Sequence, residues 1–231
     1  MAIINYLLIA LGAGIITILG GLLSLKIKND ASVRYWIALA SGLLIGTALF
    51  EMLPEIEGKF FVVAIGFFFM YVLAKLLLIH ACGEYECEIH TITWPALLSM
   101  AIDNIVDGMA IASGFLVNPL TALVIALAIS IHEAIQSFSA VIIMKKDRYP
   151  RWKIFSTIIL FGITIPLGAL FFGTLLSNYL TYLLAFAAGV FIYVGASDLL
   201  PEAHQKFNIG VVASVVLGAA IAPVLHFLLG A

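Results

Sequence analysis

The chain has 231 residues, of which 64% are hydrophobic and only 10% are charged, and its mean hydropathy is +1.18. This composition excludes a water-soluble globular domain, since soluble chains are about 25% charged. The formal net charge of −2 gives no reason to expect a nucleic-acid partner. We therefore expect an all-α polytopic membrane protein, embedded in the lipid bilayer, with a single transmembrane domain over residues 1–231.

Several apolar stretches are long enough to cross a bilayer, which takes about 20 residues of helix. In chain order we predict eight spans, at roughly residues 3–25, 33–53, 60–81, 93–115, 120–143, 153–174, 180–200 and 209–230. The connections between them are short, so little chain remains for a soluble domain. The first span lacks a basic n-region and a small-residue cleavage site, and we expect it to be retained.

The basic residues predict the orientation of these spans. Lys59 lies in an even-numbered connection and Lys75 within the third span. All the others lie in or beside the first, fifth and seventh connections: Lys26, Lys28, Arg34, Lys145, Lys146, Arg148, Arg151, Lys153 and Lys206. Because basic connections stay in the cytoplasm, we predict that the odd-numbered connections are cytoplasmic and that both termini are extracytoplasmic.

A short motif recurs in the second and seventh spans. Glu51-Met52-Leu53-Pro54-Glu55 and Asp198-Leu199-Leu200-Pro201-Glu202 share an acid, two apolar residues, a proline and a glutamate. We expect the two prolines to close their spans. Since the predicted topology places the motifs on opposite faces of the membrane, we predict an inverted repeat of spans 1–3 and 6–8 around a central pair, spans 4 and 5. Within the second span, Gly42 and Gly46 predict a face for close helix packing.

The fourth and fifth spans carry polar side chains near their midpoints. The fourth contains Asp103-Asn104-Ile105-Val106-Asp107-Gly108, and the fifth contains His132-Glu133-Ala134-Ile135-Gln136. Side chains four residues apart share one helix face, and two antiparallel neighbours can turn such faces towards each other. Ionisable groups at this depth are costly and usually mark an ion or proton path.

These polar residues predict a site for a divalent metal. Its candidate ligands are Asp103, Asn104, Asp107, His132, Glu133 and Gln136. Carboxylates with one imidazole suit zinc, iron(II) or manganese(II) better than an alkali ion. The alternative is a polar seam in which Asp, Asn and Gln hydrogen-bond between helices. A seam usually needs one or two such residues, whereas more of them cluster here.

The DNIVDG and HEAIQS stretches, together with the EMLPE and DLLPE motifs, resemble the ZIP (Zrt/Irt-like) family of divalent metal transporters. The likeness covers essentially the whole chain. In that family the fourth span carries H-N-x-x-[DE]-G, so Asp103 stands at the first histidine, while Asn104 and Asp107 match the asparagine and the acid. His132 and Glu133 match the start of the fifth-span motif. Gln136 stands where a histidine or glutamate is usual.

Two departures from the family pattern bear on the metal. Without the first histidine, a strict preference for zinc over iron(II), manganese(II) or cadmium is open. Some members also carry a glutamate just before Pro-x-Gly in the sixth span, which bridges two metals. Here Ile165 precedes Pro166-Leu167-Gly168, so we expect one dominant metal site.

The resemblance implies a transporter, not an enzyme, that moves a divalent metal ion, zinc first, into the cytoplasm by alternating access. The metal is then the substrate, and no prosthetic group is expected. Dimerisation is common in the family, and for so compact a chain we expect a prokaryotic plasma membrane. Glu51 and Glu55 are candidates for the entrance, and Asp198, Glu202 and His204 for the exit. Glu55 and Glu202 are equally typical of solvated helix ends.

Two other functions stay open. A membrane metal sensor would hold the same site without flux. An intramembrane metalloprotease is suggested by His132-Glu133, which opens like HExxH, but Gln136 replaces the second histidine that such a zinc site needs. His226 is expected to hydrogen-bond between helices. The connection at residues 80–90, with Cys82, Cys87 and several His and Glu residues, either captures metal or forms a solvated acidic turn.

Overall fold

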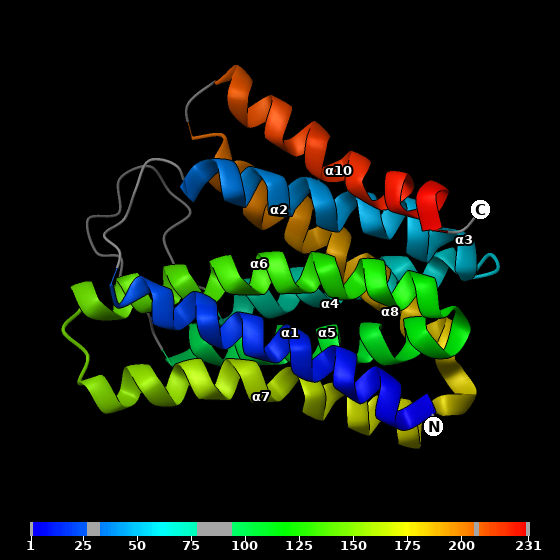
Figure 1. The fold of residues 1–231 in the computed structure, drawn as a ribbon, viewed down its shortest axis with the longest axis horizontal. Coiled ribbons are helices and arrows are strands. Elements are labelled where there is room, and N and C mark those ends of the chain that lie inside the picture. Colours follow the sequence, from blue (N-terminus) through cyan, green and yellow to red (C-terminus); the bar gives the residue numbers. More distant parts are fainter. Residues whose placement is uncertain (1, 27–32, 78–93, 206–207, 230–231) are drawn as a thin grey trace.

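The computed structural model describes residues 2–26, 33–77, 94–205 and 208–229, and these residues form a bundle of helices without a strand (Figure 1). The predicted all-α fold is confirmed to this extent. The elements are α1 (Ala2–Ser24), α2 (Val33–Thr47), η1 (Ala48–Met52), α3 (Leu53–Glu55), α4 (Phe60–Leu77), α5 (Trp94–Val117), α6 (Pro119–Lys146), α7 (Arg151–Leu175), η2 (Ser177–Tyr179), α8 (Leu180–Tyr193), η3 (Val194–Leu199), α9 (Leu200–Ala203) and α10 (Ile209–Leu229).

The helical stretches overlap the predicted spans, although the number of spans that cross the membrane stays a prediction. Within the described residues, 7 stretches are long and apolar enough to cross a membrane, and Phe60–Leu76 is a shorter apolar helix. Large apolar side chains cover the outside of the bundle; Phe61, Leu217 and Phe227 are 79%, 63% and 77% exposed. Soluble monomers rarely expose apolar surface on this scale. The surface is suited to lipid, as in an integral membrane protein.

The second and seventh spans each contain a π-helical segment, η1 and η3, at the recurring motif. In η1 the N–H of Leu53 donates to Ala48 O, and in η3 the N–H of Leu200 donates to Gly195 O, five residues back in both cases. The following Pro54 and Pro201 have no N–H and lie at the start of α3 and α9. The wider π turn lets each helix continue for one or two residues past its proline, to Glu55 and Ala203, so each proline lies in the last turn of its span, in agreement with the expectation.

The helices pack as two units that lie side by side. In the first unit α1 packs on α6 and α7, and α5 packs on α7 and α6; in the second, α2 packs on α10 and α4 packs on α8. The main contacts between the units are those of α5 with α8 and of α2 with α6. Figure 1 shows α2 and α10 together along one side of the bundle, with α1, α5, α6 and α7 along the other.

Glycine brings α2 and α10 into backbone contact. A Cβ atom added at Gly42 would overlap Val215 O, and one added at Gly46 would lie 2.5 Å from Ala219 O. The close-packing face predicted from Gly42 and Gly46 is confirmed.

Both termini and α3 lie at one end of the bundle, and the connection between α6 and α7, which includes the basic Arg148, lies at the other (Figure 1). Lys28 and Lys206, used in the orientation argument, lie outside the described residues.

Candidate metal centre

The candidate centre lies between α5 and α6, which are joined by a tight turn at Asn118. The Asn118 side chain accepts a hydrogen bond of 3.0 Å from the backbone N–H of Leu120, and Pro119 occupies the first position of α6. Both features are typical of a helix N-terminus. Asn118 Nδ2 also donates to Glu55 Oε1 at 3.0 Å, which ties this turn to α3. The turn makes α5 and α6 antiparallel neighbours, as the sequence predicts.

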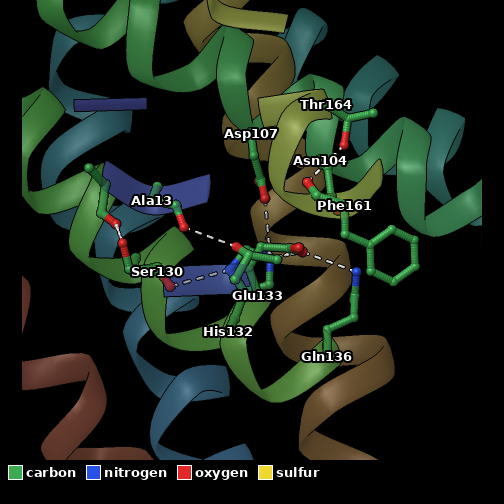
Figure 2. Close-up of polar contacts among 12 residues, drawn as sticks. Ala13, Asn104, Asp107, Ser130, His132, Glu133, Gln136, Phe161 and Thr164 are labelled. Atoms are coloured by element: carbon green, nitrogen blue, oxygen red, sulfur yellow. Dashed lines mark hydrogen bonds and ion pairs between the residues drawn. The ribbon is translucent and has the colours of Figure 1, made fainter. Parts of the chain in front are cut away.

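An imidazole and carboxylates meet at this interface (Figure 2). His132 Nε2 of α6 lies 3.4 Å from Asp107 Oδ2 of α5 and 3.2 Å from Glu133 Oε1. One ligand atom from each of Asp103, His132 and Glu133 lies within 4.8 Å of the others. All four side chains are buried, with at most 3% exposed. The fold thus gathers these four predicted ligands into one cluster.

The orientation of His132 leaves one ring nitrogen for the cluster. Its Nδ1 lies 3.2 Å from the carbonyl oxygen of Ala128, one turn back in α6. We assign the proton to Nδ1 on this contact, because a carbonyl can only accept. The lone pair of Nε2 then faces the carboxylates. A backbone carbonyl behind the second nitrogen is a usual partner for a metal-binding histidine.

The cluster holds more acceptors than donors. Asn104 Oδ1, Asp107 Oδ2 and Glu133 Oε2 are buried and have no hydrogen-bond partner among the described residues. Across the same part of the chain, the basic side chain in contact with these carboxylates is His132, and none of them pairs with Lys or Arg. A polar seam would pair its donors and acceptors across the interface. A cluster of this kind instead requires a cation or protons, since an uncompensated buried charge costs about 3–5 kcal/mol.

The two amides occupy different places. Asn104 Nδ2 donates to the carbonyl oxygen of Phe161 in α7 at 2.9 Å, which fixes the amide and leaves Oδ1 unpartnered at the cluster (Figure 2). Gln136 is only half-buried, and its Nε2 donates to Glu133 Oε1 at 3.0 Å. Gln136 therefore contacts the cluster through Glu133. The role of Phe161 has no signal in the sequence, because a backbone atom supplies it.

Gly108, the last residue of the fourth-span motif, sets the distance between α5 and α7. A Cβ atom at this position would overlap Ile165 O and lie 2.5 Å from Ala169 N. The two backbones are in contact directly beside Asp107. This explains why a glycine follows the acid, and it makes α7 the rigid support of the cluster.

The predicted entrance and exit residues differ in exposure. Glu51, in η1, is 1% exposed, and its Oε2 lies 3.1 Å from His226 Nδ1 of α10, so His226 contacts another helix as expected. Asp198 of η3 and Glu202 of α9 are exposed, and Asp198 is close enough to Asp103 and to Lys75 to interact electrostatically. His204 Nδ1 lies 3.2 Å from Leu200 O of its own turn.

The connection at residues 80–90 lies outside the described residues.

Comparison with known proteins agrees with this architecture. The sequence model of a family described as ZIP Zinc transporter matches residues 79–226, a segment that includes the whole cluster. A curated relative, "Zinc transporter ZIP13" of Danio rerio, is 28% identical over 126 residues, or 52% of this chain. The match spans 36% of the relative's length. Since the family match covers more than half of the chain, the protein belongs to the ZIP zinc transporter family.

Proposed function

We propose that the protein carries a divalent transition metal ion across the membrane into the cytoplasm, and that Asp103, Asn104, Asp107, His132 and Glu133 bind the ion in transit. The observation that carries this proposal is the buried cluster of carboxylates and imidazole, in which Asp107 Oδ2 and Glu133 Oε2 have no donor and no Lys or Arg pairs with the carboxylates among the described residues. Family membership and the zinc transporter relative support the same function. We assign no catalytic residue.

The chemistry of the donors supports zinc as the first candidate substrate. Zinc accepts imidazole and carboxylate ligands in a tetrahedral arrangement. The predominance of oxygen donors, among them Asn104 Oδ1, keeps iron(II), manganese(II) and cadmium as alternatives. Gln136, the last of the predicted ligands, positions Glu133 through its hydrogen bond. It could bind the ion itself only if it released the Glu133 carboxylate.

We further propose the inverted repeat of spans 1–3 and 6–8 around α5 and α6. Under this repeat α2 corresponds to α8 and α4 to α10, so the pair α2 with α10 corresponds to the pair α8 with α4. The pair α1 with α6 corresponds in the same way to α7 with α5. The matching π segments, each followed by Leu and Pro, support the relation. Both termini are then extracytoplasmic, in agreement with the basic connections on the opposite side.

We propose inward transport on the family resemblance, and the proposed topology assigns the two ends of the path. Glu51, at the proposed outer end, is buried, whereas Asp198 and Glu202, at the proposed inner end, are exposed. This difference supports an arrangement that is closed to the outside and accessible from the cytoplasm, with Asp198, Glu202 and His204 along the exit. On the family resemblance we propose a homodimer, and for so compact a chain we propose a prokaryotic plasma membrane.

Metal uptake into proteoliposomes that contain a metal-sensitive dye tests the proposal. We expect saturable influx of zinc, with cadmium, iron(II) and manganese(II) run in parallel, and loss of influx in Asp107→Ala and in His132→Ala. Thr174→Val is a suitable control, because the Thr174 hydroxyl is exposed and bonds only to carbonyls of its own helix.

Flux also separates the proposal from its alternatives. A folded protein that binds metal but transports none would refute it and favour the sensor. Cleavage of a peptide would favour the metalloprotease, although Gln136 donates to Glu133 where such an enzyme needs a second histidine.

A further inference from the structure

A second acidic group is buried far along the bundle from the central cluster. Glu51 lies in the π segment η1 and is 1% exposed. Its Oε1 has no hydrogen-bond partner among the described residues, and its Oε2 lies 3.1 Å from His226 Nδ1. One turn earlier, the buried Thr47 Oγ1 is also unpartnered. A buried carboxylate with one unpartnered oxygen beside an imidazole repeats, on a smaller scale, the chemistry of the central cluster.

The frame around this pair is rigid. Glu51 follows α2 directly, and His226 belongs to α10, the helix whose backbone touches that of α2 at Gly42 and Gly46. Gly218 of α10 makes the reciprocal contact, since a Cβ atom there would overlap Leu39 O. Helices in backbone contact cannot approach further or slide without steric overlap. The packing of the two helices therefore sets the distance between the backbones from which the carboxylate and the imidazole extend.

The geometry of the pair fits a metal ion. Zinc binds histidine nitrogen and carboxylate oxygen at about 2.0–2.2 Å, which in a tetrahedral site places the two ligand atoms roughly 3.3 Å apart. The observed separation of Nδ1 and Oε2 is 3.1 Å. An ion could enter between the two atoms after a shift of a few tenths of an ångström. The His226 side chain is 52% exposed, which leaves room for water as a further ligand.

We propose that Glu51 and His226 form a second divalent-cation site at the end of the bundle where α3 and the C-terminal end of α10 lie, with Thr47 and water as additional ligands. Its role rests on the proposed function: on the proposed topology this is the extracytoplasmic end, so the site would receive the ion before it passes to the central cluster. The binding itself does not depend on transport.

Equilibrium binding of radioactive zinc to the purified full-length protein tests the site without any flux. The central cluster is first disabled by the double substitution Asp107→Ala with His132→Ala. In this background we expect His226→Ala and Glu51→Gln each to lower the bound zinc by one ion per chain. Any zinc bound at residues 80–90 is common to all samples and cancels in the difference.

A control variant and a folding check separate the loss of a metal ligand from a general loss of structure. Phe227→Ala, at the next position of α10, which is also exposed, should bind as much zinc as the background. Glu51→Gln preserves the volume of the side chain, and thermal unfolding without metal checks that it and His226→Ala remain folded. Unchanged zinc binding in both variants would overturn the site. Loss of one ion without any flux in the wild type would leave the site standing and refute only the transport function.

If transport is confirmed, the role of the site can be measured separately. In an otherwise unmodified protein, Glu51→Gln should raise the external zinc concentration needed for half-maximal influx and leave the maximal rate unchanged. A lower maximal rate at an unchanged half-maximal concentration would contradict a loading role.

Discussion

The side chains of the cluster divide into those that present an unpartnered oxygen and those that hold the other side chains in place. Asp107 and Glu133 each present a buried oxygen without a donor, while His132 is oriented by Ala128 O. The spacing within the two motifs was sufficient to predict that these residues meet. The contact of Asn104 with Phe161 was not predictable, because it depends on how a third helix, distant in sequence, packs against α5.

Gln136 provides a test at this scale. Because its amide donates to Glu133 Oε1, we expect Gln136→Leu to weaken zinc binding by roughly tenfold, the effect of losing a group that orients a ligand. Glu133→Ala should abolish binding at the cluster. Isothermal titration with zinc measures both. Complete loss of binding in Gln136→Leu would instead identify Gln136 as a direct ligand.

At the scale of the elements, the recurring proline motif marks both a helix end and a π turn. The prolines of the recurring motif predict the ends of two helices, and they do lie within one turn of the ends. What could not be predicted is the π turn before each proline, because it depends on whether the preceding N–H groups bond to the carbonyl five residues back or to the one four residues back. The turn places Glu51 and Asp198 in equivalent positions of the two segments.

Gly108 allows a prediction for the contact of α5 with α7. Gly108→Ala would force a methyl group into the backbone of α7 at Ile165, and overpacking of this kind costs about 1–3 kcal/mol. We expect a lower unfolding temperature in detergent and reduced metal uptake, because Asp107 is the adjacent residue. Gly12→Ala in α1 is the matched control, since a Cβ atom there has nothing within 4 Å. Equal effects of the two substitutions would argue against a specific contact.

For the whole molecule, the hydrophobic pattern predicted the helical bundle and the approximate bounds of its helices. Beyond the central pair α5 and α6, it could not predict which helices become neighbours, because the other helices lack a comparable cluster of polar side chains. The packing into two units instead depends on small residues such as Gly42 and Gly46, which decide where backbones can touch. The orientation in the membrane remains a prediction from the basic residues.

Chemical labelling tests this orientation. In a Cys82→Ser, Cys87→Ser background, a single cysteine replaces either Asn178, between α7 and α8, or Lys146, at the end of α6; both positions are exposed. We expect a membrane-impermeant maleimide to label Asn178→Cys on intact cells and Lys146→Cys only after the membrane is opened. The reverse pattern would invert the topology and the proposed direction of transport.

The Asn118 side chain links the first unit to α3, which continues from α2 of the second unit through η1, since its Oδ1 caps α6 and its Nδ2 donates to Glu55 of α3. Any movement of α5 and α6 relative to α3 must break the bond to Glu55, which is worth about 0.5–1.5 kcal/mol. An equilibrium between two arrangements of the units would then shift towards the bonded one by a few-fold to about tenfold. A single amide can thus adjust the fraction of time spent in each arrangement while leaving the affinity of the metal-binding residues untouched.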